Sequence, residues 1–351
     1  MQKKSSAVSF WFFIGCFMVM CQIIIGGITR LTDSGLSITE WNVIKGTLPP
    51  LNETEWTLSF DKYKTFAKKQ FESIHKDMTL EQYKRIFFWE YFHRLWARAM
   101  GFVFLIPFFY FLVRRKIPTN LIKRLLIVIF LASLSAIFGW IMVASGLSND
   151  KRTWVNAYNL LIHLILASSL FSYLILTYYK YAYREMESRI ELYDYYILKI
   201  IGVVLITQIG FGALVAGMKA ALVFPYPFVL LNLDVYRDII AISPSIQWAD
   251  WINYEPNPII KLIIQSIHRL TAYSLLILSL WFFYVNKSKM FIVPSFLIFY
   301  IALFIQIVLG ILTVTYSIGS VPIYFGVLHQ ATAFILLASY LWILYSSKKR
   351  R

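Results

Sequence analysis

Charged residues are scarce in this sequence, and this scarcity is the first clue to its class. They make up 15% of the 351 residues, whereas about a quarter of the residues in a soluble domain are charged. Apolar types reach 59%, and they occur in long blocks rather than in the stripe of an amphipathic helix. The composition therefore excludes an ordinary soluble domain.

Cysteine is almost absent as well. The two cysteines, Cys16 and Cys21, lie five positions apart in one apolar block. Because helix residues rotate by about 100° per position, the two side chains point to different faces. We therefore expect no disulfide between them and interpret both as small packing residues.

Eight apolar blocks are long enough to cross a hydrocarbon core of about 30 Å at 1.5 Å per residue. Open sheet edges cannot lie in lipid, so each block is predicted to be a helix. The first block lacks a small-residue cleavage site, and we interpret it as a retained helix rather than a signal peptide. The predicted spans are residues 8–28, 86–113, 125–147, 154–179, 197–217, 260–285, 291–316 and 322–345.

Acidic residues are few, 18 against 34 Lys and Arg, which gives a net charge of +16. Such an excess can indicate nucleic-acid binding, but here the basic residues follow the positive-inside pattern of membrane proteins. We expect lipid and no nucleic acid as a partner, with both termini cytoplasmic. The inside clusters are Lys3 and Lys4, Arg114 to Lys116, Lys123 and Arg124, Lys180 to Arg189 with Lys199, Lys287 and Lys289, and Lys348 to Arg351; the short outer links carry mainly Lys151 and Arg152.

The chain also repeats itself. His-Arg-Leu occurs at 93–95 and again at 268–270, in the second and sixth spans. We predict an all-α integral membrane protein of two four-helix bundles, residues 1–190 and 191–351, related by a pseudo-twofold axis near the membrane normal. The odd spans share a polar residue four positions before a glycine, which indicates helix packing for the glycines and leaves the role of the glutamines open. These pairs are Gln22 and Gly26, Ser135 and Gly139, Gln208 and Gly212, and Gln306 and Gly310.

Histidine is rare too, with five in the chain. We expect His75, in the polar first loop, to be a solvated residue. The other four lie seven to nine residues after the starts of the even-numbered spans, so they share a depth of about 10–14 Å. Ionisable residues at such depth are usually functional. The four are His93, His163, His268 and His329.

Two histidines in each half suit haem better than a bare metal. Zinc or copper needs three or four converging protein ligands, whereas haem brings four nitrogens of its own and needs only two facing imidazoles in a bundle core. The sequence therefore predicts two bis-histidine haems. Arg94 and Arg269 directly follow candidate ligands, and we expect them to pair with haem propionates. Arg98 is a weaker candidate, and ion pairs within the protein are the alternative.

One asymmetry separates the halves. Glu90 lies three residues before His93 and therefore on the same helix face, whereas the equivalent residue in the second half is Gln265. A carboxylate can move protons and an amide cannot. We expect a reactive haem in the first half and an electron-transfer haem in the second, with a structural ion pair of Glu90 as the alternative.

Together these residues resemble the haem A synthases, the Cox15/CtaA family, over nearly the whole chain. The resemblance rests on a set of motifs in both halves and not on His-Arg alone. These motifs are residues 26–37, Trp41, 46–50, Glu90 to Arg94, 145–147, Tyr158 to His163, 212–217, 268–273, and 306–313 followed by 321–323 and His329-Gln330.

The resemblance implies an enzyme that oxidises a porphyrin methyl group of haem O to a formyl group, giving haem A for terminal oxidase assembly. By resemblance, His268 and His329 hold haem b as cofactor. His93 and His163 ligate the substrate haem, and Glu90 is needed for catalysis. The expected partners are the haem O synthase (protohaem farnesyltransferase) and an electron-transfer protein; a homo-oligomer is left open.

The charge pattern places the haem sites near the outer leaflet, and the resemblance implies a cell inner membrane with these sites toward the periplasm. Two departures from the family pattern fall in outer loops. Phe224-Pro-Tyr-Pro227 replaces an Asn-Thr-x-Pro-like stretch, and a proline expected near Val43 is missing. The first outer loop has no cysteine pair, as in the proteobacterial and mitochondrial branch. Two rival functions stay open: a membrane electron carrier with two haems b and no oxygenation activity, and a transporter with histidine proton relays.

Overall fold

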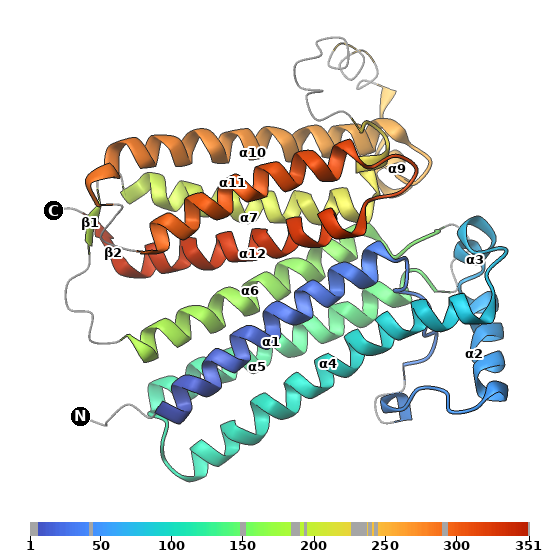
Figure 1. Cartoon of the computed structure of the whole chain (residues 1–351), viewed down its shortest axis with the longest axis horizontal. Coiled ribbons are helices and arrows are strands. Elements are labelled where there is room, and N and C mark those ends of the chain that lie inside the picture. Colours follow the sequence, from blue (N-terminus) through green and yellow to red (C-terminus); the bar gives the residue numbers. More distant parts are fainter. Residues whose placement is uncertain are drawn as a thin grey trace. The chain divides into compact units, whose positions relative to one another are not determined.

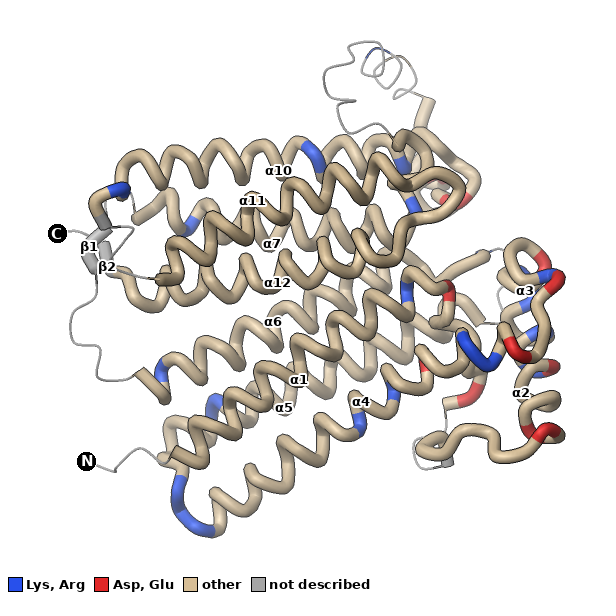
Figure 2. Tube along the Cα trace, in the orientation of Figure 1, with Lys and Arg blue, Asp and Glu red and all other residues tan. Residues whose placement is uncertain are grey.

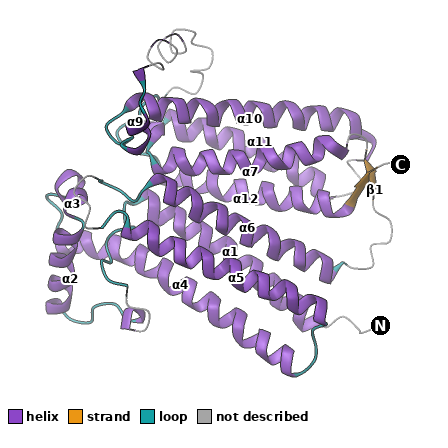
Figure 3. Ribbon diagram, turned by 180° about the vertical axis from the view of Figure 1, so that it is seen from behind, coloured by secondary structure: helices purple, strands orange, loops and turns teal. Residues whose placement is uncertain are grey.

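The computed structural model describes residues 6–41, 45–147, 152–183, 190–192, 195–225, 237, 241, 245–289 and 294–349 (Figure 1). Helix dominates this part of the chain (Figure 3). Eight of the described helices are long and apolar enough to cross a membrane, which confirms the predicted all-α membrane class. The chain divides into two compact units, residues 1–184 and 185–351; the sequence-based division falls at residue 190.

Each unit contains four of the long helices, and the pairing of helices is the same in both. In unit 1, α1 (Ser6–Leu31) packs against α4 (Leu80–Val113) and α6 (Ala157–Ala182), and α5 (Thr119–Ala144) packs against α6. In unit 2, α7 (Tyr195–Gly217) packs against α10 (Pro258–Asn286) and α12 (Ile323–Ser346), and α11 (Pro294–Thr315) packs against α12. The recurring pairing is what an internal repeat requires, and the pseudo-twofold axis itself stays a prediction.

Shorter elements lie between the long helices. Unit 1 adds η1 (Lys45–Thr47), α2 (Glu53–Phe66) and α3 (Lys68–Ile74). Unit 2 adds β1 (Ile190–Leu192), η2 (Ala220–Leu222), α9 (Trp248–Ile252), η5 (Lys287–Lys289) and β2 (Ser347–Lys349). The two strands pair in parallel, with Ile190 opposite Ser347 and Leu192 opposite Lys349.

The starts of the helices follow local sequence signals. Thr79 and Gln82 form the capping box that their spacing predicts, so α4 begins at residue 80, several residues before its apolar block. Asn257 caps α10, and the following Pro258 takes the first helical position, where its missing N–H removes nothing. The third span was predicted from residue 125, but α5 begins at Thr119. Its first turns include basic residues, of which Arg124 lies 5.9 Å over the ring of Tyr173.

Pro107 lies inside α4 and removes one backbone donor from that helix. The carbonyl that loses its partner is that of Val103, four residues earlier. Trp11 of α1 supplies a replacement, because its indole N–H donates to the Val103 carbonyl at 3.1 Å. The α1–α4 contact is thus held by a specific hydrogen bond within an apolar region.

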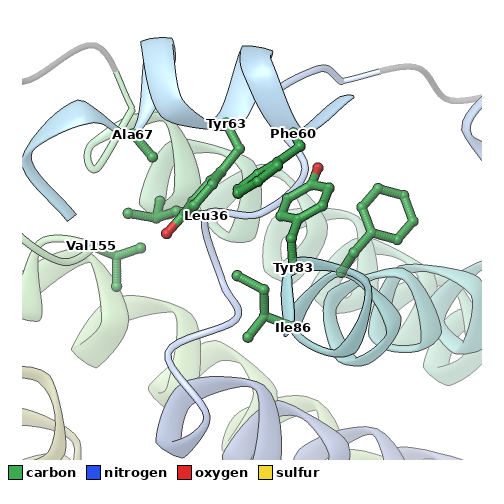
Figure 4. Packing of buried hydrophobic residues seen from close by; sticks show 8 residues of the cluster. Leu36, Phe60, Tyr63, Ala67, Tyr83, Ile86 and Val155 are labelled. Atoms are coloured by element: carbon green, nitrogen blue, oxygen red, sulfur yellow. The ribbon is translucent and has the colours of Figure 1, made fainter. Parts of the chain in front are cut away.

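A small outer subdomain of unit 1 covers the start of α4. The polar, Lys-rich composition of residues 61–77 predicts a solvated helix, but the structure has two helices, α2 and α3, with one face buried. The aromatic rings of Phe60, Tyr63 and Tyr83 pack together at the centre of the contact (Figure 4). The ring centroid of Tyr83 lies 4.9 Å from that of Phe60, which is stacked on it, and 5.5 Å from that of Tyr63, which is tilted. Burying each such ring stabilises the packed form by about 1.5–3 kcal/mol. The buried cluster consists of Leu36, Phe60, Tyr63, Ala67, Tyr83, Ile86, Phe87 and Val155.

His75 belongs to this outer subdomain and not to the membrane interior. It ends α3, is half-buried, and its Nδ1 lies 2.6 Å from the hydroxyl of Tyr63. Burial raises the pKa of the Tyr63 phenol above its ordinary value, so the hydroxyl stays protonated at neutral pH. The prediction of a solvated residue was therefore wrong in detail, because the fold of the first loop gives His75 a structural partner.

Charge is distributed unequally along unit 1. Arg114, Arg115 and Lys116 gather at the link between α4 and α5, whereas the acidic residues of α2 and α3 lie at the opposite end of α4 (Figure 2). Residues of α2 and α3 also include Lys62, Lys64, Lys68 and Lys69, so the orientation that the positive-inside pattern predicts stays a prediction. Predictions made for Val43, Lys151, Tyr226 and Pro227 and for several basic residues of the links fall outside the described residues.

Candidate functional site

The four membrane histidines occupy equivalent places. His93 and His163 lie on α4 and α6 of unit 1, and His268 and His329 lie on α10 and α12 of unit 2. Within each unit the two histidines are close enough to interact electrostatically. None of the four side chains is fully covered by protein. The structure thus brings together both predicted pairs.

In unit 1, each histidine ring lies over a glycine of an odd-numbered helix. A methyl group built on Gly26 of α1 would lie 3.2 Å from Nε2 of His93, and one built on Gly139 of α5 would lie 3.0 Å from Cε1 of His163. Any larger side chain at these positions would occupy the place of the ring. The glycines, interpreted from sequence as packing residues, pack against the histidines themselves.

Unit 2 repeats this arrangement. A methyl group on Gly212 of α7 would lie 3.4 Å from Cε1 of His268, and one on Gly310 of α11 would lie 3.0 Å from Cε1 of His329. The four glycines are those of the repeated motif in the odd spans. Their spacing carried a signal for these contacts, but nothing in the sequence assigned each glycine to a particular histidine.

In three of the four motifs the polar residue contacts the histidine that packs on the glycine of the same motif. The amide nitrogens of Gln22, Gln208 and Gln306 lie 2.9, 3.3 and 3.3 Å from Nε2 of His93, His268 and His329. All three glutamines thus contact a candidate ligand, through a hydrogen bond that also joins two helices. The fourth motif has Ser135, whose hydroxyl bonds to its own helix at Leu131.

Backbone carbonyls fix the tautomer of two histidines. Nδ1 of His163 donates to the carbonyl oxygen of Ser135 at 2.9 Å, and Nδ1 of His329 donates to that of Gln306 at 3.1 Å. Because a carbonyl can only accept, Nδ1 carries the proton and Nε2 keeps its lone pair. This is the tautomer that a metal-ligating histidine needs, and an oriented Nδ1–H is the usual support for such a ligand.

The donor set fits haem better than a bare cation. Among the described residues no group of three or more His, Cys, Asp or Glu side chains converges, so neither pair could complete a tetrahedral metal site. Two imidazoles suit a group that brings its own equatorial nitrogens, and where a glutamine amide lies on Nε2 that amide has to give way to the group. In unit 1 the helices that carry the pair, α4 and α6, both pack along α1 and make little contact with each other.

Glu90 is buried and fully engaged by its surroundings. One carboxylate oxygen accepts from Arg94 at 2.6 Å. The other accepts from the Ser37 hydroxyl at 2.8 Å and from the Ile38 backbone N–H at 2.9 Å. The ion pair that sequence reasoning gave as an alternative is present, and the carboxylate also holds the first outer loop against α4.

Arg94 completes this contact with the loop. Its guanidinium donates to the carbonyl oxygens of Ile38 and Glu40 at 2.9 and 3.1 Å, and it lies 5.2 Å over the ring of Trp41. These partners come from the protein, whereas the sequence led us to expect a haem propionate. A pocket of about 220 Å³ adjoins Arg94 and Trp41 and is also lined by Trp140, Val143 and Leu147. Arg98 is partly buried one turn further along α4.

The second unit uses the same positions with different chemistry. Gln265 and Arg269 both donate to the backbone carbonyl of Phe224, each at 3.2 Å. In each unit the loop that follows the first helix is therefore held by two side chains of the next long helix. These are Glu90 and Arg94 in unit 1 and Gln265 and Arg269 in unit 2. In unit 1 an acid accepts from the loop; in unit 2 an amide donates to it. The carboxylate is present in unit 1 only.

Sequence reasoning missed the support behind Glu90. Ser37 donates to Glu90, and its own carbonyl accepts from the hydroxyl of Tyr83 at 3.0 Å. Tyr83 also bonds Ser59 of α2 at 2.7 Å. A chain of hydrogen bonds thus joins the outer subdomain to the carboxylate, and only the Ser37-containing motif gave a sequence signal for it.

Fold and site define a multi-pass membrane protein that carries two equivalent two-histidine sites, one in each unit. The chain belongs to the COX15-CtaA family of cytochrome oxidase assembly proteins, whose model matches residues 9–341. It is 35% identical over 352 residues to the haem A synthase of Flavobacterium psychrophilum, covering 99% of this chain and 100% of that protein. It is 38% identical to the haem A synthase of Ehrlichia ruminantium strain Gardel, covering 99% and 95%. The enzyme of that name from the Wolbachia of Brugia malayi is 34% identical, covering 99% of each. The resemblance drawn from the sequence motifs is confirmed.

Proposed function

We propose that this protein is a haem A synthase, which oxidises a methyl group on the porphyrin ring of haem O to a formyl group. One observation carries the proposal beyond family membership. Three residues before the first histidine of each pair, unit 1 has the carboxylate of Glu90 and unit 2 has the amide of Gln265. A carboxylate at this position can accept a proton and an amide cannot, which suits a reaction in unit 1.

Unit 1 is the substrate side of the proposal. His93 and His163 ligate haem O, and Glu90 acts on the reacting edge as the carboxylate that accepts a proton or balances developing positive charge. Ser37, Ile38 and Arg94 orient this carboxylate and keep it in place. Removing one partner of such a buried ion pair costs about 3–5 kcal/mol, so the loop and the acid act as one structural piece.

Unit 2 is the cofactor side. His268 and His329 hold haem b, which when bound supplies one-electron transfer. Gln208 and Gln306 contact the Nε2 atoms of these histidines, and Gln306 also fixes a tautomer through its carbonyl. Arg269, bonded to the Phe224 carbonyl, is the residue we assign to a haem b propionate.

The protein acts in the inner membrane, with both haem sites toward the periplasmic side. Haem O comes from a protohaem farnesyltransferase, and an electron-transfer protein exchanges electrons with the haem of unit 2. The basic residues Arg114, Arg115 and Lys116 at the α4–α5 link support this orientation.

Haem extraction tests the proposal. The full chain is produced in a host that makes haem O, and its haems are extracted and chromatographed. Haem A in the extract is expected. Haem b alone would favour the electron carrier, and a colourless protein would contradict both haem functions and favour the transporter.

Glu90→Gln tests the assignment of the reactive unit. The variant should form no haem A and should keep the absorption spectrum of the haem in unit 2. Glu81→Gln is the matched control, because Glu81 lies on the same helix and is exposed, paired with Lys84. If Glu90→Gln retains activity, unit 1 does not react through this carboxylate.

A further inference from the structure

The two histidines of each pair are not held equally. The ring of His163 meets a methyl group built on its glycine at 3.0 Å and donates from Nδ1 to a carbonyl, and the ring of His329 does the same. For His93 and His268 the corresponding methyl distances are 3.2 and 3.4 Å. The difference recurs in both units, on the last helix of each.

The close contact between glycine and histidine falls on Cε1, the ring carbon bonded to both nitrogens. In His329 the nearest ring atom to Gly310 is Cε1, which lies between Nδ1 and Nε2. A shift of Cε1 by a few tenths of an ångström would turn the Nδ1–H away from the Gln306 carbonyl and change the direction of the Nε2 lone pair. Glycine at this position therefore sets the ring orientation as well as providing space.

We propose that Gly139 and Gly310 are positioning residues that fix His163 and His329 as the preset ligands, leaving His93 and His268 as the ligands that adjust when haem enters or leaves. The proposal rests on the assignment of haem to the histidine pairs. It does not rest on haem A formation, because a haem carrier without oxygenase activity would need the same ligand geometry.

A glutamine amide bonds Nε2 of each adjusting histidine, but this contact separates the two ligands only in unit 1, because Gln306 also lies 3.3 Å from Nε2 of His329. The Gln22 amide bonds Nε2 of His93 and also the backbone carbonyl of His93 at 3.3 Å. Gln208 bonds Nε2 of His268 and accepts from the Thr271 hydroxyl one turn along α10. A flexible amide on Nε2 gives each imidazole a partner while iron is absent. In unit 1 the preset ligand His163 has its backbone-held Nδ1 instead, with Ser135 at the glutamine position.

The decisive comparison uses unit 2 of the full chain, purified with its haem. Gly310→Ala places a methyl group 3.0 Å from His329, and Gly212→Ala places one 3.4 Å from His268, an ordinary contact distance. Gly101→Ala is the open control, since a methyl group there has no neighbour within 4 Å. Because alanine favours a helix over glycine, a loss in any of these variants does not come from helix propensity.

Haem content and the absorption spectrum are the readouts. Gly310→Ala should lower the affinity of unit 2 for haem by roughly 10–100-fold, the usual effect of losing a group that orients a ligand, and should shift the remaining haem from low-spin to high-spin. Added imidazole should restore the low-spin spectrum, because it replaces a displaced ring but cannot repair a misfolded bundle. Gly212→Ala and Gly101→Ala should keep the wild-type spectrum.

Three outcomes would overturn the proposal. Low-spin haem in Gly310→Ala would show that the close contact between Gly310 and His329 is not needed. Equal losses of haem in Gly310→Ala and Gly212→Ala would show only that the helix interface rejects methyl groups. Loss of monodisperse protein without imidazole rescue would assign Gly310 to packing. Gly139→Ala gives an independent check in unit 1, where weaker spectral titration with haem O is expected. Low-spin haem without haem A in the wild type would contradict the proposed function, and the comparison of Gly310→Ala with Gly212→Ala would still decide the positioning proposal.

Discussion

The indole nitrogen of Trp11 donates to the carbonyl oxygen of Val103 at 3.1 Å, the carbonyl that Pro107 leaves without its helical partner. Trp11→Phe should therefore destabilise the α1–α4 contact by about 1 kcal/mol, the usual size of an interhelical hydrogen bond in a membrane protein. Thermal unfolding in detergent measures this. In a Pro107→Ala background Val103 regains a helical donor, so Trp11→Phe should then have a smaller effect. Equal effects in both backgrounds would show that the ring, and not the N–H, is what matters.

Tyr83 connects the outer subdomain to the carboxylate of Glu90 through Ser37. Tyr83→Phe leaves the buried Ser37 carbonyl without its donor, and we expect a loss of about 1–3 kcal/mol in unfolding free energy. The ratio of haem A to haem O in extracts should fall, because Ser37 no longer holds Glu90 firmly. Tyr91→Phe is the control: its hydroxyl donates to the exposed Thr47 carbonyl, away from this chain of bonds. A Tyr83→Phe variant with the wild-type haem ratio would disconnect the subdomain from the reaction.

Arg94 joins the loop to α4 by bonds in three directions. Lysine keeps the charge, but its ammonium group lacks the planar fork of donors with which arginine reaches two carbonyls and a carboxylate. In Arg94→Lys, hydrogen exchange of the backbone around Ile38 should speed up, since its N–H donates to the Glu90 carboxylate that Arg94 holds. Arg269→Lys, the equivalent change in unit 2, should leave exchange at Ile38 unchanged. Similar protection of Ile38 in the wild type and Arg94→Lys would mean that Glu90 alone retains the loop.

Gly146 lies under Leu36 of the first outer loop. A methyl group there would lie 2.7 Å from Cδ2 of Leu36 and 3.2 Å from the Val155 backbone nitrogen. Gly146→Ala should lower stability by about 1–3 kcal/mol through overpacking. Gly101→Ala, with open space around it, should be neutral or slightly stabilising. Differential scanning of both variants separates the two expectations, and equal melting temperatures would show that Leu36 repacks freely.

Much of this architecture could be predicted because membrane helices announce themselves locally. The apolar blocks gave all eight long helices, and the Thr79–Gln82 spacing gave the true start of α4. The four histidines stood out since ionisable side chains are rare at that depth. The repeated motif was visible, although which glycine meets which ring depends on helix rotation, and one chain's sequence does not specify that.

Long-range polar contacts were harder to predict. Arg94 was assigned to a haem propionate; in the structure Glu90 of the same helix pairs with it, and the first loop folds back to add the carbonyls of Ile38 and Glu40. The helix pair α2 and α3 looked solvated because its composition is polar, while Phe60 and Tyr63 bury one face against α4. Both differences arise from the path of the first outer loop, which is set by tertiary packing rather than by local pattern.

The short pairing of β1 with β2 has a consequence for biosynthesis. Strand β1 lies just before the first helix of unit 2, and β2 follows directly after its last helix. The pairing of β1 with β2 can therefore form only once residues 347–349 have been translated. Every helix of unit 1 has left the ribosome long before. Since domains generally fold in the order of their synthesis, the inserted chain passes through a stage with a formed first unit and an unclosed second one. Early in that stage helices α7, α10 and α11 still lack α12, the helix that carries His329 and is translated just before β2.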